Sequence, residues 1–388
     1  MALTAEKLRQ ALPLVQRAGV DAWITFVRET SAAGDPVLPL LLNGGLTWQS
    51  ALIVFSDGRT VAIVGNYDAD PLAASGDWSE VVPYVQGIRE PLQAALRGAT
   101  TVAVNYSRND VMADGLTHGM FLTLQELLPG IELRSAEEIV SELRSVKTPE
   151  EAERIRQAIR TTQGIFEEIP RVVRRGMSER DLYDHIQARI EERRLGYAWD
   201  KAGNPIVNFG PHSMVGHGVP SPEIRLEEGQ ILHIDLGVVE CDYSSDLQRC
   251  WFVGDSIPDE VLQAFACVNS ALSAGAQALR PGARGVDVDA AARGSFVANG
   301  YEEYLHALGH QVGRLAHDGG GILGPAWERY GNTPFLPVKE NQVYTLELGA
   351  MVPGRGYLGL EEMVRVRTNG VEWLSDRQLS LPTLSLAR

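Results

Sequence analysis

Five residues of metal-ligand type stand out in the second half of this 388-residue chain. They are four carboxylates and one histidine: Asp235, Asp246, His310, Glu347 and Glu361. Asp235 and Glu347 interrupt apolar runs that otherwise predict buried strands. A single acid in a strand is more often a bulge, an edge position or a hydrogen-bonded core residue. Burying an unpaired carboxylate costs several kcal/mol, roughly, so the five together favour a bound metal as the common partner.

The spacing of the carboxylates predicts two hairpins that bring them together. Asp235 and Asp246 are eleven residues apart across a turn-like Glu-Cys-Asp-Tyr stretch. Glu347 and Glu361 are fourteen apart across Val-Pro-Gly-Arg-Gly, which is strong turn chemistry. Four negative charges at close range would repel one another, and two divalent cations would neutralise them. An oxygen-rich site with one imidazole suits manganese, cobalt, iron or zinc.

Composition limits the class of protein. The net charge of -15 and the pI near 5.1 argue against nucleic acid as a partner, because phosphate binding needs a basic surface. Uninterrupted apolar stretches stay short of the ~20 residues that span a bilayer. The start of the chain predicts an amphipathic helix rather than a signal peptide, so we expect cytoplasmic residence. Cys241, Cys250 and Cys267 form neither a paired disulfide framework nor a C-x-x-C metal clip, which fits a reducing compartment.

The order of patterns along the chain predicts two domains. Residues 1–145 alternate short apolar strands, such as 51–55 and 61–64, with amphipathic helical stretches, which is an α/β pattern. A new domain is expected over residues 146–388. It opens with a helix that has Thr148 as N-cap and Pro149 at its first position.

The predicted domain of residues 146–388 contains further helix signals. A second helix is expected from Ser178, and two more near residues 258–280 and 286–299. Strands and turns are expected between these helices and after them.

Short motifs in this second domain resemble the pita-bread metallopeptidases, which include methionine aminopeptidase, aminopeptidase P and prolidase. The resemblance rests on the ordered segments 209–221, 235–237, 243–246, 309–313, 317–318, 345–349 and 360–362. It implies an α+β fold: a pita-bread catalytic domain with a smaller, creatinase-type α/β domain before it. Methionine aminopeptidases generally lack that first domain. The His317-Asp318 pair is more similar to prolidases than to aminopeptidase P.

The resemblance also implies roles for the five metal-ligand residues. Asp235 would chelate one ion, Asp246 and Glu361 would bridge both, and His310 with Glu347 would complete the second. The implied cofactor is two divalent ions per subunit, with manganese first and cobalt or zinc as alternatives. A pair of metals about 3.5 to 4 Å apart can share a water, lower its pKa and polarise the scissile carbonyl. Glu347 could also accept the proton of the attacking water.

Three histidines outside the ligand set receive different predictions. By the resemblance, His217 and His317 match two histidines that contact the substrate and the tetrahedral intermediate. His233 alternates onto the strand face of Asp235, where packing or hydrogen bonding is its expected use.

The chain departs from the family pattern at three positions around these ligands. Gly359 stands where prolidases and aminopeptidases P commonly carry an arginine, two residues before Glu361. Gln248 replaces a usual threonine, and Leu348 a frequent proline. The missing arginine leaves open how a dipeptide carboxylate would be held, since a bidentate guanidinium is not easily replaced. The candidate substitutes are Arg314, Arg329 and Arg355.

The resemblance therefore implies a metal-dependent peptidase acting on Xaa-Pro bonds, and we expect first an Xaa-Pro dipeptidase. Its expected substrates are proline-containing dipeptides or short peptides, and the family implies a homodimer. Aminopeptidase P activity on longer peptides is the alternative within the same chemistry. A creatinase-like or lyase-like member that is not a peptidase is the alternative of a different class. Gly-x-Ser-x-Gly and phosphate-loop motifs are absent from the sequence.

Overall fold

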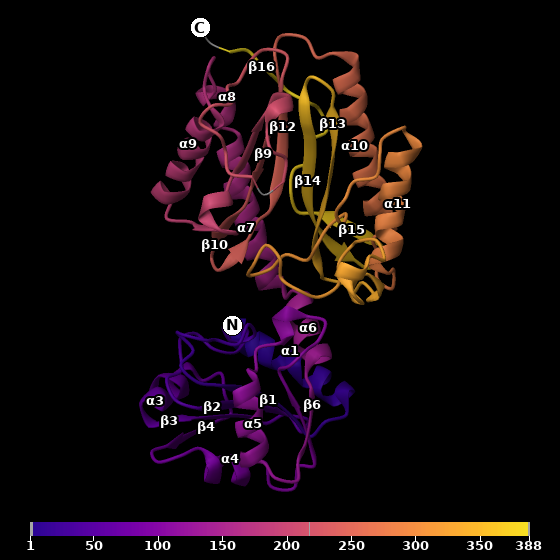
Figure 1. Ribbon diagram of the computed structural model, residues 1–388. Helices are drawn as coiled ribbons and strands as arrows, with labels where there is room; N and C mark the ends of the chain where they lie inside the picture. The colour runs from indigo at the N-terminus through magenta and orange to yellow at the C-terminus, as the bar shows by residue number, and fades with distance from the viewer. Residues whose placement is uncertain (1–2, 217, 387–388) are drawn as a thin grey trace. The chain divides into compact units, whose positions relative to one another are not determined.

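The computed structural model describes residues 3–216 and 218–386. The chain divides into two compact units, Met1–Thr148 and Pro149–Arg388, which are described separately here (Figure 1). Within the described residues, none of the helices combines the length and the apolar composition that a membrane span requires.

The first unit is built on a mixed six-stranded sheet in the order β4-β3-β2-β1-β5-β6. Its strands are β1 (Ala22–Val27), β2 (Ser50–Phe55), β3 (Thr60–Gly65), β4 (Glu80–Tyr84), β5 (Thr101–Val104) and β6 (Glu132–Ser135). Its helices are α1 (Leu3–Ala18), α2 (Leu38–Leu41), α3 (Asn66–Ser75), α4 (Arg89–Ala95), α5 (His118–Leu127) and α6 (Glu137–Ser145). The strands predicted at 51–55 and 61–64 are confirmed as β2 and β3.

Alternating side chains of β1 seal both faces of this sheet. Trp23 and Val27 join a core cluster with residues of α1 and α6, whereas Ile24 and Phe26 join a second cluster with residues of α4 and α5. The unit is therefore a three-layer α/β structure with an apolar core on each side of the sheet (Figure 1).

The second unit contains a larger sheet, in the order β13-β14-β12-β9-β8, to which β15 and β16 add at β14 and β12. A small sheet runs β11-β10-β7. The strands are β7 (Gly196–Tyr197), β8 (Ile206–Phe209), β9 (Ile231–Leu236), β10 (Val238–Glu240), β11 (Tyr243–Ser244), β12 (Leu247–Val253), β13 (Val343–Val352), β14 (Gly356–Arg367), β15 (Gly370–Trp373) and β16 (Thr383–Leu384).

The five helices described in the second unit are α7 (Pro149–Phe166), α8 (Ile169–Val172), α9 (Glu179–Glu192), α10 (Asp259–Ala278) and α11 (Gly285–Ala298). Four of the five begin within one residue of the predicted starts, and α8 was not predicted. Ser178 caps α9 with a reciprocal hydrogen bond to Asp181. Short 3₁₀ turns complete the chain: η1 (Val111–Ala113) in the first unit, and η2 (Lys201–Gly203), η3 (Gly210–His212), η4 (Glu328–Tyr330) and η5 (Thr333–Phe335) in the second.

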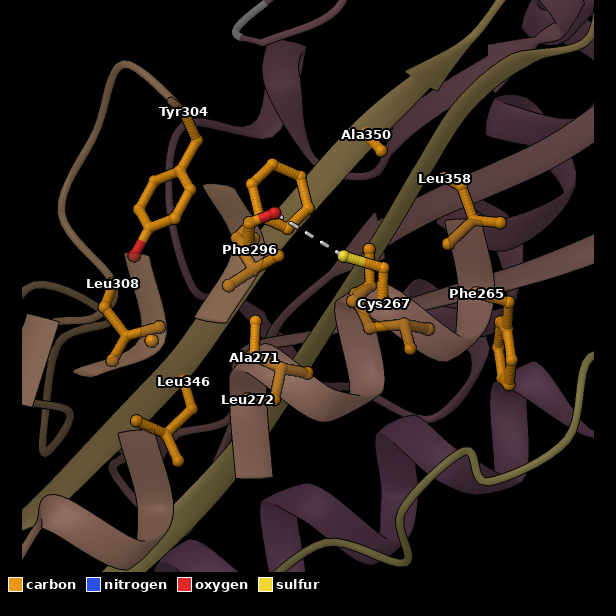
Figure 2. Packing of buried hydrophobic residues seen from close by; sticks show 14 of the residues in the cluster. Phe265, Cys267, Ala271, Leu272, Phe296, Tyr304, Leu308, Leu346, Ala350 and Leu358 are labelled. Atoms are coloured by element: carbon orange, nitrogen blue, oxygen red, sulfur yellow. Dashed lines mark hydrogen bonds between the residues drawn. The ribbon is translucent and has the colours of Figure 1, made fainter. Parts of the chain in front are cut away.

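The core of the second unit lies between α10, α11 and the long β13–β14 hairpin. Figure 2 shows Ala271 and Leu272 of α10 near Leu346 of β13, with Phe296 of α11 close by. The thiol of Cys267 contacts the Phe296 carbonyl oxygen at 3.9 Å, which ties the two helices together. One face of the hairpin is thus apolar and sealed, so its polar residues must project from the opposite face.

Both predicted acidic hairpins are present. β9 pairs with β12 and β10 with β11, so the chain reverses at Cys241 and Asp242, which both have positive φ. β13 pairs with β14 across the Pro353–Arg355 turn. The pairing of β12 with β14 then joins the two hairpins in one sheet.

Candidate metal centre

A row of polar residues crosses the larger sheet at a single level. Glu347 on β13 pairs with Glu361 on β14, and Glu361 pairs with Gln248 on β12. Gln248 in turn pairs with Asp235 on β9. Directly opposed residues project from the same face of a sheet. Four strands from two hairpins that are distant in sequence therefore present three carboxylates and one amide side by side.

Asp246 and His310 complete the group from two other positions. Asp246 precedes Gln248 by two residues, so strand alternation points both to the same face. His310 lies in a segment that runs beside β13. Its N–H donates to Thr345 Oγ1 at 3.1 Å, and the Thr345 N–H donates to the His310 carbonyl at 2.9 Å.

The donor atoms lie close enough to share an ion. His310 Nε2 is 3.7 Å from Asp246 Oδ2 and 3.6 Å from Glu347 Oε1. One donor atom from each of Asp246, His310 and Glu361 lies within 4.8 Å of the others. Asp246 and Glu361 are buried, whereas the Glu347 side chain is 21% exposed, so the group opens on one side.

Burial raises the pKa of all four carboxyl groups, and neighbouring carboxylates add to this for Asp246, Glu347 and Glu361. Burial raises the pKa of Asp235 to about 7, and burial followed by the charge of Asp235 raises that of Glu347 to about 8. Burial followed by neighbouring carboxylates raises the pKa of Asp246 and of Glu361 well above their usual values. Without a cation, these groups therefore retain protons near neutral pH.

His310 has the opposite electrostatic character. Burial, followed by the neighbouring His317, lowers the pKa of His310 to about 3, so the ring is neutral. Its Nδ1 faces the Gln311 carbonyl oxygen at 3.4 Å. This acceptor favours the tautomer protonated at Nδ1 and leaves the lone pair of Nε2 directed at the carboxylates.

The residues present fit a divalent metal. Asp235 Oδ1 and Glu361 Oε2 are buried without a hydrogen-bond partner in the described structure. Such unsatisfied oxygens are costly unless a cation is bound. Four carboxylates with one neutral imidazole form the oxygen-rich donor set that manganese, cobalt or zinc accept.

The two predicted substrate histidines differ in what the structure describes. The His317 ring packs edge-on against His310, with centroids 4.3 Å apart, so it lies beside the candidate ligands. His217 lies outside the described residues.

The arginines considered as substitutes for the missing family arginine make contacts elsewhere. Arg314 contacts Asp242, Arg329 contacts the Leu305 carbonyl, and Arg355 contacts Glu260. The space beside Gly359 is instead filled by side chains that the sequence did not single out for this purpose. A Cβ atom at residue 359 would lie 2.5 Å from Tyr357 Cε1, 2.7 Å from Gln248 Oε1 and 2.9 Å from His233 Nε2.

These neighbours include residues that the sequence analysis missed. Gln248 was noted only as a departure from the family pattern, and Tyr357 and Asn208 were not noted. The available signal was strand alternation, which places Gln248 on the face of Asp246 and Tyr357 on the face of Glu361. Burial raises the pKa of the Tyr357 hydroxyl, and the charge of Glu347 adds to this, so the phenol is neutral beside the centre.

A surface hollow of about 610 Å³ lies at a different place in the second unit. Its lining residues are Glu150, Arg154, Gly196, Val239, Cys241 and Asp242. None of these is a candidate ligand, so the hollow is separate from the metal centre.

Comparison with known sequences identifies the family. The sequence model of metallopeptidase family M24 matches residues 153–368, which is more than half of the chain and spans all five candidate ligands. The chain belongs to metallopeptidase family M24. Members of this family use divalent metals, and the structure contains a matching Asp/His/Glu group.

Relatives and solved structures agree with this membership. The chain is 28% identical to an Xaa-Pro dipeptidase of Pyrococcus furiosus over 69% of this chain and 73% of that protein. It is 25% identical to an uncharacterized peptidase of Staphylococcus aureus over 84% of this chain and 87% of that protein. The dipeptidase PepE of Mycobacterium ulcerans superposes with a TM-score of 0.76 at 25% identity, covering 99% of both chains. The predicted α+β pita-bread fold, with its smaller α/β N-terminal domain, is thereby confirmed.

Proposed function

We propose that this M24 protein hydrolyses Xaa-Pro peptide bonds, and that it acts first as an Xaa-Pro dipeptidase. The observation that carries the proposal is the convergence of four carboxylates and a neutral imidazole, where two of the carboxylates have a buried oxygen without a described hydrogen-bond partner. The Xaa-Pro dipeptidase of Pyrococcus furiosus, to which the chain is similar, supplies the substrate class.

In this proposal two divalent ions, manganese by preference, are held by the five residues. By the family resemblance, Asp235 would hold one ion, Asp246 and Glu361 would be shared between the two, and His310 with Glu347 would hold the second. When bound, the ions would polarise the scissile carbonyl and lower the pKa of a water.

The protein's own residues would then orient groups and transfer protons. Glu347, whose side chain is 21% exposed, would accept a proton from the attacking water. His317, adjacent to His310, is placed to donate a hydrogen bond to the oxygen that becomes negatively charged in the transition state. His217 is proposed as a second substrate contact on the resemblance alone.

Aminopeptidase P activity is the second candidate, and one observation favours it. The arginine that could bind a dipeptide carboxylate is replaced by Gly359, and the three alternative arginines contact other groups. A longer peptide would not need its C-terminal carboxylate held in the site. An X-Pro aminopeptidase of Thermotoga maritima has the same fold, with a TM-score of 0.70 at 24% identity.

The test is hydrolysis of an Xaa-Pro dipeptide and of the same peptide extended by two residues, with manganese and after chelation. Metal-dependent cleavage of the dipeptide in preference to the longer peptide is expected. Preference for the longer peptide would favour aminopeptidase P, and cleavage of neither would refute the peptidase assignment. The homodimer and cytoplasmic residence remain predictions, testable by solution mass and by fractionation.

A further inference from the structure

A series of polar side-chain contacts leads from Glu347 away from the candidate ligands. Gln248 Nε2 donates to Glu347 Oε2 at 3.1 Å. Gln248 Oε1 lies 3.0 Å from His233 Nε2, and His233 Nδ1 lies 3.0 Å from Asn208 Oδ1. Asn208 Nδ2 donates to the Met214 carbonyl at 3.1 Å. This series of contacts therefore links Glu347 to a main-chain atom through three buried side chains.

We propose that Gln248 is the positioning residue of Glu347 in the metal centre. The inference rests on the proposed function, because it assigns a role within that centre. Gln248 fixes one oxygen of Glu347 by hydrogen bonding, and it thereby reserves the other oxygen for the metal.

The geometry divides the two oxygens of Glu347 between different partners. Oε2 accepts the amide proton of Gln248, whereas Oε1 lies 3.6 Å from His310 Nε2. A carboxylate without the amide contact could rotate about its terminal torsion, since that torsion is broad. With the contact, only Oε1 remains directed at the group formed by Asp246, His310 and Glu361.

The position of Gln248 in the sheet makes it suited to this role. It pairs with both Glu361 and Asp235, so it is the only uncharged member of the row Glu347–Glu361–Gln248–Asp235. An amide donates to a carboxylate without adding a fifth negative charge. His233 contacts the Oε1 atom of Gln248, and Gly359 leaves the space that this atom occupies.

The support behind Gln248 is rigid. The His233 ring packs edge-on against Tyr357, with centroids 5.0 Å apart, and both His233 and Asn208 are 3% exposed. Burial lowers the pKa of His233 to about 4, so its neutral ring has one N–H; donation from Nε2 to Gln248 Oε1 leaves the lone pair of Nδ1 facing Asn208. Groups that orient a metal ligand in this way typically change metal affinity by roughly 10-fold to 100-fold when they are removed.

The test is a double-mutant cycle measured by calorimetric binding of Mn²⁺ to the chelated protein. Gln248→Met keeps the length of the side chain and removes both hydrogen bonds. It should lower the affinity of one manganese ion by roughly 10-fold to 100-fold. In a Glu347→Ala background, the same change should have an effect below about 2-fold, because the residue acts through Glu347. Equal losses in both backgrounds, or no loss in either, would overturn the inference.

Two further variants separate positioning from folding. Gln342→Met removes a buried glutamine whose Oε1 accepts bonds from Lys339 N and Tyr344 Oη at 2.8 and 2.9 Å. It should lower the melting temperature and leave manganese affinity unchanged. Asn208→Ala removes the side chain farthest from Glu347 in this series of contacts. It should lower manganese affinity, as Gln248→Met does, but by a smaller factor. If Asn208→Ala changed the melting temperature without changing manganese affinity, the proposed coupling from Asn208 through His233 and Gln248 to Glu347 would be contradicted.

The binding readout keeps this inference distinct from the proposed function. If the wild-type protein binds manganese and shows the predicted cycle but cleaves no Xaa-Pro peptide, the function fails and the positioning role stands. If it cleaves the peptide but the cycle is additive, only the positioning role fails.

Discussion

Each unit of the molecule buries an aspartate near its sheet, and the two units treat that aspartate differently. Asp35 in the first unit accepts hydrogen bonds from the Val37 N–H at 3.0 Å and from Asn105 Nδ2 at 2.8 Å. In the second unit, Asp235 Oδ1 is buried without a described hydrogen-bond partner, and three more carboxylates surround it. Burial raises the pKa of both residues.

The comparison distinguishes a structural acid from a functional one. A structural acid has its hydrogen bonds completed by the protein, so its burial costs little. A group of acids left incomplete lowers the stability of the protein alone and becomes favourable only when a cation binds. Marginal stability at a site is the usual cost of function.

The largest expected effect is on the metal centre itself. Asp246→Ala should lower Xaa-Pro hydrolysis and manganese affinity by more than about 100-fold, because it removes a proposed bridging ligand. Steady-state kinetics and calorimetry measure the two effects, and a melting curve checks that the variant is folded. Wild-type rates in a folded variant would refute the site as drawn.

Removing the metal should reveal a pH dependence of stability. Asp235 and Glu347 have folded-state pKa values of about 7 and about 8, above the usual carboxyl values. The unfolded chain therefore loses these protons at lower pH than the folded chain, and stability falls as pH rises from about 4 through about 8. We expect the melting temperature of chelated protein to drop across this range and to recover with manganese. A flat or rising curve for chelated protein would contradict the mutual repulsion of the carboxylates.

The two buried aspartates give the sharpest contrast when both are changed to asparagine. Asp35→Asn should destabilise the protein by about 2 kcal/mol, because the new amide donor faces the Asn105 amide, and it should leave manganese affinity unchanged. Asp235→Asn should leave the chelated protein as stable as wild type or more stable, because it removes a repelling charge, and it should abolish binding of one manganese ion. If both variants changed stability in the same direction, the comparison would fail.

The smallest expected effect is a change in stability when Gly359 is replaced by alanine. Gly359→Ala should cost about 2 kcal/mol, because its Cβ would lie within 2.9 Å of Tyr357, Gln248 and His233. The control is Gly294→Ala in α11, where a Cβ meets nothing within 4 Å; it should stabilise the helix by up to about 1 kcal/mol. Chemical denaturation of both variants measures the difference, and equal stabilities would show that the space beside Gly359 is not filled as described.

Local patterns in the sequence predicted much of this structure. The N-cap residue Ser178 and the proline at the first helical position, Pro149, located the starts of two helices, and turn chemistry located both acidic hairpins. These features depend on neighbouring residues, so they can be read from a short window.

The contacts between the two hairpins could not be predicted in this way. The pairing of Gln248 with Glu361 joins β12 to β14 across more than a hundred residues, and its register depends on the whole sheet. For that reason the sequence identified the acids but not the amide that lies between them. The residues that fill the space beside Gly359 were missed for the same reason, because their proximity depends on the register of the whole sheet.

The most direct test of the central claim is a manganese titration of chelated wild-type protein. Bound metal and Xaa-Pro dipeptide hydrolysis are measured in the same samples, with Asp246→Ala beside them. We predict two ions bound per chain, with hydrolysis rising as they bind, and little of either in the variant. Metal binding that is equal in the two proteins, or hydrolysis that survives chelation, would contradict a catalytic centre formed by these five residues.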